Sequence, residues 1–271
     1  MDMSRVIAGA SARVKHALHF HAVRFSKWHA LGNSYLLVEE PVDAELARRL
    51  CDPRRGIGSD GVLEVVAIHG AHAELVIWNP DGSTAELSGN GARIAARWLA
   101  LRSGDARVGL RVGGREVAAA VDGEQVRLEV GAVRVDEVET LEVGEERVEL
   151  TPVSVGNPHA VVRIEPDRAT LLRLGPALER HERFPERTNV QLVRVDGRHD
   201  LTVAVWERGA GETESSGTSA VAAAAAAVAN GWAESPVTVR LPGGDLLVEL
   251  DGDGRATLVG PAVEIARGEL V

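Results

Sequence analysis

Two serine–glycine turns are the residues of this chain best placed to do chemistry. Ser88 lies in the stretch "AELSGNGAR" (85–93), and Ser216 lies in the similar stretch "TESSGTSAV" (213–221), at an offset of 128 residues from Ser88 to Ser216. Each serine precedes a glycine where we expect a helix to begin. A helix N-terminus carries backbone N–H groups without partners inside the helix, and the positive end of the helix dipole. The two turns therefore predict binding of an anion such as a carboxylate or a phosphate.

The same serines also have an ordinary structural interpretation. Serine is a common N-cap, because its side-chain oxygen accepts a hydrogen bond from the first turn of the helix. One such turn alone favours the cap, whereas two matching turns favour a function, since two facing helix ends could hold one carboxylate from both sides. We therefore take Ser88 and Ser216 as the candidate catalysts. The candidate carboxylate-binding residues at the helix starts are Gly89, Asn90, Gly217 and Thr218.

The elements that position the first turn are a strand and a helix. The stretch "HAELVIWN" (72–79) has the apolar residues of a buried strand. After the polar turn, "ARIAARWLALR" (92–102) is typical of a helix that places Ile94, Trp98 and Leu101 on one side.

The second turn has the same surroundings. "LTVAVWE" (201–207) predicts a strand, and "AVAAAAAAVANG" (220–231) predicts a helix that ends at Asn230 and Gly231. Because this helix is apolar all round, we expect it to be buried.

Further similarities extend the repeat beyond the two turns. "GNSY" (32–35) is similar to "GNPH" (156–159), in the same order along the chain as the turns. Residues 109–162 alternate apolar and polar residues between glycine turns, which is typical of short antiparallel strands. We interpret this as a duplication that gives two similar α/β domains.

The predicted fold class is α/β, with two pseudo-symmetric domains that each wrap an antiparallel sheet or barrel around a central helix. We expect an N-terminal domain at 23–132, joined by about 260–271, and a C-terminal domain at 133–259. Residues 1–22 do not form a good signal peptide. We expect them to be an extension that is disordered or not native.

Composition excludes several classes of partner. The formal charge of −10, without clusters of lysine or arginine, argues against binding to nucleic acid. No apolar run approaches the roughly 20 residues needed to span a bilayer. Cys51 is the sole cysteine, so an internal disulfide is excluded. We expect a cytoplasmic protein without a metal site, and we assign His19 and His21 to a mobile tail. The sequence leaves a homodimer open.

The motifs resemble those of a known family, the diaminopimelate epimerases. The resemblance runs from about Phe25 to the C-terminus. Its motifs are "GIGSDG" (56–61), "NPDGSTAELSGNGAR" (79–93), "GNPHAV" (156–161), "ERTNVQ" (186–191) and "ERGAGETESSGTS" (207–219). The resemblance implies a cofactor-free enzyme with two mirrored halves and the active site between them. It also implies an interconversion of LL- and meso-2,6-diaminopimelate, on the route to lysine and peptidoglycan.

The chain departs from the family at the positions that matter most. The family's acid and base are two cysteines, and Ser88 and Ser216 occupy those positions here. A serine hydroxyl does not ionise near neutral pH and needs an adjacent base to become reactive. Gly61 stands where the family usually has glutamine, and Ser34-Tyr35 stands where it usually has Asp-Phe.

The resemblance also implies a set of substrate-binding residues. By resemblance, the distal amino-acid end of the substrate is held by Asn33, Asn79, Asn157, Asn189, Glu207 and Arg208. Arg208 offers a cation for a carboxylate, and Glu207 an acceptor for an ammonium group. His159 is implied behind these residues, and could act as a base for a serine.

Three hypotheses follow from the sequence. The first is a small-molecule epimerase that works with the two serines or with an altered acid/base pair. The second is a related isomerase that uses a carboxylate, with Glu86, Glu212 or Glu214 as the candidates. The third is a protein that only binds its substrate, either a natural relative without activity or an engineered Cys-to-Ser variant.

Overall fold

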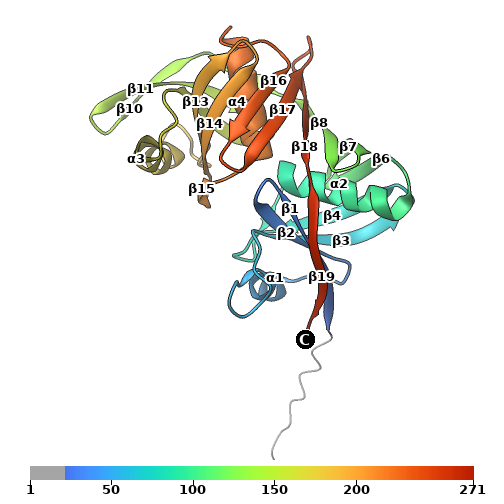
Figure 1. Cartoon of the computed structure of the whole chain (residues 1–271). Coiled ribbons are helices and arrows are strands. Elements are labelled where there is room, and N and C mark those ends of the chain that lie inside the picture. Colours follow the sequence, from blue (N-terminus) through green and yellow to red (C-terminus); the bar gives the residue numbers. More distant parts are fainter. Residues whose placement is uncertain (1–21) are drawn as a thin grey trace, which may run out of the picture.

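The computed structural model describes residues 22–271 and shows two lobes (Figure 1). The expectations on His19, His21 and the extension up to residue 21 lie outside the described residues. The first lobe contains β1 (Val23–Ala30), β2 (Asn33–Val38), α1 (Ala44–Cys51), β3 (Val62–His69), β4 (His72–Trp78), β5 (Thr84–Ala85), α2 (Gly89–Ser103), β6 (Arg107–Val112), β7 (Arg115–Asp122) and β8 (Gln125–Ala132).

The second lobe repeats this order of elements. It contains β9 (Arg134–Val135), β10 (Glu139–Val143), β11 (Glu146–Ser154), β12 (Pro158–Arg163), α3 (Arg168–Glu179), β13 (Asn189–Gly197), β14 (Asp200–Glu207), β15 (Gly211–Thr213), α4 (Gly217–Ala229), β16 (Val237–Leu241), β17 (Gly244–Leu250) and β18 (Arg255–Pro261). The last strand of the chain is β19 (Val263–Leu270).

The pairing of strands shows the duplication directly. In the first lobe β2 pairs parallel with β3 across α1, and β4 pairs parallel with β6 across α2. In the second lobe β12 pairs parallel with β13 across α3, and β14 pairs parallel with β16 across α4. The hairpins β6–β7–β8 and β16–β17–β18 are antiparallel in both. The predicted pair of similar α/β domains is therefore confirmed, as are the antiparallel strands within 109–162.

The C-terminal strands connect the lobes. β18 pairs antiparallel with β8, and β19 then runs antiparallel to β1, the first strand of the chain. Figure 1 shows β18 and β19 as one long path from the upper lobe to the lower lobe. These strand pairings join the two lobes.

Each lobe encloses one central helix. The side chains of residues 220–227 of α4 are at most 4% exposed, which confirms the burial predicted from their composition. Alanine side chains let the surrounding strands approach the helix closely. In α2, Ile94 and Trp98 are buried, whereas Leu101, which the spacing places on the same side, is 62% exposed. Leu101 lies in the last turn of α2, whereas the neighbouring Leu99 is buried.

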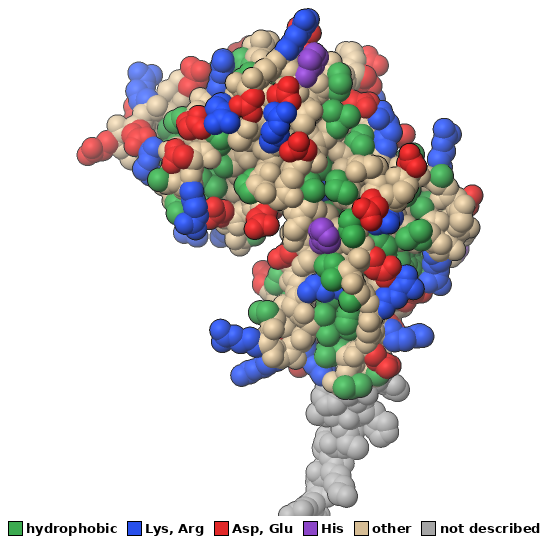
Figure 2. Space-filling view, viewed as in Figure 1, with side chains coloured by type: hydrophobic (Ala, Val, Ile, Leu, Met, Phe, Trp, Pro, Cys, Tyr) green, Lys and Arg blue, Asp and Glu red, His purple; other side chains and the backbone are tan. Residues whose placement is uncertain are grey.

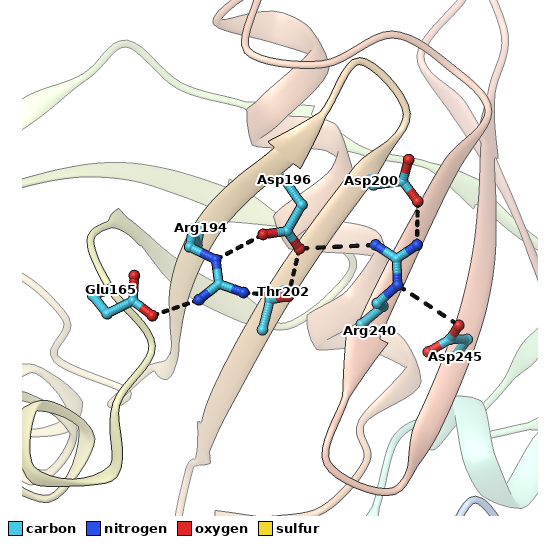
Figure 3. A network of polar contacts seen from close by, with 7 residues as sticks. All are labelled: Glu165, Arg194, Asp196, Asp200, Thr202, Arg240 and Asp245. Carbon is cyan, nitrogen blue, oxygen red and sulfur yellow. Dashed lines mark hydrogen bonds and ion pairs between the residues drawn. The ribbon is translucent and has the colours of Figure 1, made fainter.

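The surface of the molecule is hollowed between the lobes, at the left of the view in Figure 2, and acidic and basic side chains are mixed over this face. A network of ion pairs and hydrogen bonds crosses the outer strands of the second lobe (Figure 3). Its members are Glu165, Arg194, Asp196, Asp200, Thr202, Arg240 and Asp245. Because these side chains are solvent-exposed to a large extent, each pair contributes only about 0–1 kcal/mol. Within the described chain, no helix has the length and apolarity to cross a bilayer.

Candidate active site

The two predicted helix ends meet. α2 begins at Gly89 and α4 at Gly217, as predicted, each directly after its serine. A Cβ atom built on Gly89 would lie 3.0 Å from the Cα of Gly217, and one built on Gly217 would lie 3.0 Å from the Cα of Gly89. Because the backbones are in contact, only glycine fits on either side. The unpaired N–H groups and the positive dipole ends of two helices therefore converge on one place.

Ser88 has two hydrogen-bond donors directed at its oxygen. As the N-cap of α2 it accepts from the backbone N–H of Gly91 at 3.0 Å, and it also accepts from the hydroxyl of Tyr35 at 3.0 Å. Tyr35 is 7% exposed. Burial raises the pKa of Tyr35 above its ordinary value, so this phenol stays protonated at neutral pH.

Ser216 has a different partner. Its carbonyl accepts from Ala220 at 3.0 Å in the first turn of α4, but its hydroxyl makes no cap bond and instead lies near the carboxylate of Glu207. Burial raises the pKa of Glu207, although hydrogen bonds from Thr213 and Ser216 oppose the shift. The two serines are therefore equivalent in the backbone and different in their side-chain partners.

A cavity of about 900 Å³ is lined by residues of both lobes, among which are neither Ser88 nor Ser216. Four of the predicted binding residues line it, namely Asn33 and Asn79 from the first lobe and Glu207 and Arg208 from the second. The charged residues of its wall are mostly acidic, since Asp60, Asp81, Glu212 and Glu214 are also present. Tyr35 lines it as well, so the partners of both serines, Tyr35 and Glu207, face this space.

Asn90 ties the helix ends together across the lobes. Its Nδ2 donates to Asn33 Oδ1 at 3.1 Å and to the carbonyl of Ser215, just before α4, at 3.0 Å. Its Oδ1 accepts from the guanidinium of Arg93 at 2.8 Å. Arg93 is fully buried, and burial lowers its pKa to about 9. Sequence reasoning did not identify Arg93, because its role depends on burial rather than on its motif.

The remaining predicted residues support the site from behind. Asn189 donates to the carbonyl of Pro158 at 3.0 Å and accepts from the backbone N–H of Arg208 at 3.0 Å. His159 is fully buried and bonds through its two ring nitrogens to Asn157 and Gln191. Burial, with the nearby charge of Arg208, lowers the pKa of His159 to about 3, so the imidazole is neutral.

Glu179 at the end of α3 fixes the loop that carries Arg208. Its carboxylate accepts from the indole N–H of Trp206 at 2.8 Å and from the backbone N–H of Gly209 at 3.0 Å. Burial opposes ionisation of this carboxyl, but these two bonds and the nearby arginines lower its pKa overall. No sequence motif marks Glu179, because α3 meets this loop only in the folded chain.

The carboxylates considered for other chemistry have other surroundings. Glu86 is exposed, and Glu212 forms an ion pair with Arg168 at 2.9 Å. Glu214 lines the cavity beside Gly32.

Thr218 is buried in the first turn of α4. Within residues 22–271, no group of three or more histidine, cysteine, aspartate or glutamate residues is arranged to hold a metal ion.

The fold is one that solved racemases and epimerases share. A probable proline racemase from Agrobacterium radiobacter K84 superposes with a TM-score of 0.72 at 19% identity, over 92% of this chain and 93% of that chain. A hydroxyproline epimerase from Agrobacterium vitis superposes with a TM-score of 0.68 at 17% identity, over 92% of this chain and 91% of that chain. At such identities these similarities establish the fold alone.

Sequence comparison identifies the family within this class. The model of the diaminopimelate epimerase family matches residues 25–135 and 151–265. The diaminopimelate epimerase of Desulfitobacterium hafniense is 38% identical over 275 aligned positions, which cover 90% of this chain and 97% of the relative. That of Pseudomonas entomophila is 39% identical over 273 positions, 92% of this chain and 99% of the relative. The chain belongs to the diaminopimelate epimerase family.

Proposed function

We propose that this protein interconverts LL- and meso-2,6-diaminopimelate by moving a proton at the α-carbon. The observation that carries the proposal is the contact of the two helix N-termini at Gly89 and Gly217, each preceded by a serine. Inversion requires an acid on one face of the carbon and a base on the other. The negative charge that develops on the carboxylate requires preorganised donors, which two helix ends provide.

The wall of the cavity suits the other end of such a substrate. A distal amino-acid group is a zwitterion, and the guanidinium of Arg208 would pair with its carboxylate. The carboxylate of Glu207, with the amide oxygens of Asn33 and Asn79, offers acceptors for ammonium groups. We therefore assign substrate recognition to these four residues, and assign Asn189 and Asn157 to holding the loops that carry them.

Ser88 and Ser216 are the groups that we place against the α-carbon. A serine needs a neighbouring group that takes or supplies its proton. Each serine has such a neighbour, because Ser88 accepts a hydrogen bond from Tyr35 and Ser216 lies near the carboxylate of Glu207. The proposed reaction therefore uses side chains of this protein alone.

Solvent exchange tests the proposal. The protein is incubated with LL-diaminopimelate in deuterated buffer, and the α-proton is followed by NMR beside a calorimetric titration. We expect loss of the α-proton signal together with appearance of the deuterated meso isomer. Binding without exchange would instead support a protein that only holds its substrate, which the replacement of both thiols by serine favours as the second candidate.

L-Lysine is the matched control ligand, because it lacks the distal carboxylate but keeps both ammonium groups. We expect it to bind far more weakly than diaminopimelate if Arg208 holds that carboxylate. Equal binding of the two ligands, or binding of neither, would refute the assignment of diaminopimelate as the substrate.

A further inference from the structure

We propose that Tyr35 supplies the proton that Ser88 delivers, so that in one direction of the interconversion the Ser88 side protonates the α-carbon and the Ser216 side deprotonates it, whereas in the reverse direction the two sides exchange roles. This inference rests on the proposed function. It assigns Tyr35 as a positioning residue that acts through Ser88, and it divides acid and base between the two halves of the duplicated fold.

The hydrogen bonds of Ser88 define its role in the resting protein. A serine hydroxyl has two acceptor lone pairs and one donor hydrogen. The N–H of Gly91 and the O–H of Tyr35 point at the oxygen from 3.0 Å each, so both lone pairs are engaged. The remaining hydrogen is free of these bonds. Ser88 can therefore donate its hydroxyl proton, and the hydroxyl of Tyr35 can replace that proton.

Gly61 provides the space for this arrangement. A Cβ atom at Gly61 would lie 2.5 Å from the Cε1 atom of the Tyr35 ring. Any larger residue at position 61 would displace the ring that carries the hydroxyl. Gly61, Tyr35 and Ser88 are three of the positions at which the sequence departs from the family pattern, and the structure brings them into one contiguous group.

Ser216 has the opposite arrangement. Its hydroxyl is not used as a helix cap and lies near the carboxylate of Glu207, which has only acceptor atoms while it is ionised. We therefore direct its hydrogen to Glu207, which leaves its lone pairs for the α-proton. A carboxylate offers about four acceptor positions, so Glu207 can hold Ser216 and a substrate ammonium group together.

The proton balance is as follows. Ser216 Oγ takes the α-proton while its own proton passes to Glu207, and the electron pair of the broken C–H bond moves into the carboxylate held by the helix ends. The pair then forms a new C–H bond on the opposite face with the proton of Ser88. Ser88 regains a proton from Tyr35. The resulting phenolate and carboxylic acid are restored by exchange with water in the cavity.

The variant Tyr35→Phe separates exchange of the α-proton from inversion of the α-carbon. In this variant the Ser216 side still removes and returns a proton on its own face. We therefore expect one of the two isomers, LL or meso, to exchange its α-proton with deuterated water close to the wild-type rate without being inverted. The other isomer should neither exchange nor invert, and inversion should fall by about 100-fold or more. A merely structural role would instead lower exchange and inversion together.

Two further variants keep the test decisive. Gly61→Ala, which displaces the Tyr35 ring, should reproduce the separation of exchange from inversion. Ser59→Ala removes a hydroxyl that donates to the carbonyl of Gly61 at 2.9 Å and serves as the control, with both rates unchanged. Inversion by Tyr35→Phe at the wild-type rate would overturn the inference and leave the proposed function intact. Wild-type protein that binds diaminopimelate but exchanges neither isomer would overturn both.

Discussion

The contact between the two helix ends is the feature on which the proposed chemistry depends, and a single methyl group tests it. In Gly89→Ala the new Cβ would lie 3.0 Å from the Cα and 3.3 Å from the carbonyl carbon of Gly217. Carbon atoms pack at about 3.5–4.0 Å, so the two helix ends must separate by roughly 0.5–1 Å. The atoms that resist are backbone atoms, which cannot rotate away as a side chain could.

The effect on stability should be small and the effect on catalysis large. Overpacking costs about 1–3 kcal/mol, and the better helix propensity of alanine offsets about 0.5–1 kcal/mol of that. We therefore expect the free energy of unfolding to fall by about 0.5–2 kcal/mol. A displacement near 1 Å of groups that hold the reacting atoms lowers the rate by about 100-fold.

The assay compares the rate of inversion, by NMR in deuterated buffer, with the midpoint of urea unfolding. Gly252→Ala is the matched control, because a Cβ there meets no heavy atom within 4 Å, and we expect it to change neither quantity. In the double variant of Gly89 and Gly217 the second methyl enters a gap already opened by the first. The combined loss should therefore be smaller than the sum of the two single losses. Wild-type rates of inversion in Gly89→Ala would refute the proposed carboxylate cradle.

Four other perturbations test the surrounding residues. Arg208→Ala should weaken diaminopimelate binding by at least about tenfold in calorimetry, since a charge-assisted hydrogen bond contributes about 1.5–3 kcal/mol; unchanged affinity would remove Arg208 from the site. Ser88→Cys combined with Ser216→Cys should raise the rate of inversion, because a thiol ionises far more readily than a hydroxyl; an inactive variant that still binds would contradict this. Glu179 has a lowered pKa, so its stabilisation is present above its unfolded value of 4.5 and is lost as the pH falls through the folded value. Urea unfolding of Glu179→Gln should therefore lose less stability in acid than wild type. Arg93→Met removes a buried charge without a carboxylate partner, so we expect unchanged or higher stability but slower inversion, measured by the same two methods.

The sequence predicts the backbone of the site well because its signals are local. A strand, a polar turn with Ser-Gly and an apolar helix follow one another within about 30 residues, twice, and the structure places both helix starts at the predicted glycines. Burial of the alanine-rich helix also follows from composition alone. Leu101 shows the limit of periodicity, because spacing indicates a side but not whether strands reach the last turn of the helix.

The partners of the side chains are not predictable in the same way. Tyr35 and Ser88 are 53 residues apart, and Asn90 and Ser215 are 125 residues apart, so their bonds depend on how strands and lobes assemble. The sequence marked Tyr35 as a departure from the family pattern without showing what it touches. Asn189 was assigned to the substrate by resemblance, and its side chain bonds to the carbonyl of Pro158 and the N–H of Arg208.

A duplicated fold provides one of the two things that inversion of an α-carbon requires. Repetition of one strand–turn–helix unit places two equivalent backbone sites on opposite sides of a carboxylate, and the contact of Gly89 with Gly217 is its result. Inversion also requires that one proton enters on one face of the carbon and another leaves from the opposite face. The two groups that exchange these protons must therefore differ in proton affinity. Symmetry cannot supply that difference, so the side chains must. The phenol beside Ser88 and the carboxylate beside Ser216 are the places where the two halves diverge, and that divergence decides which side holds the proton before the reaction begins.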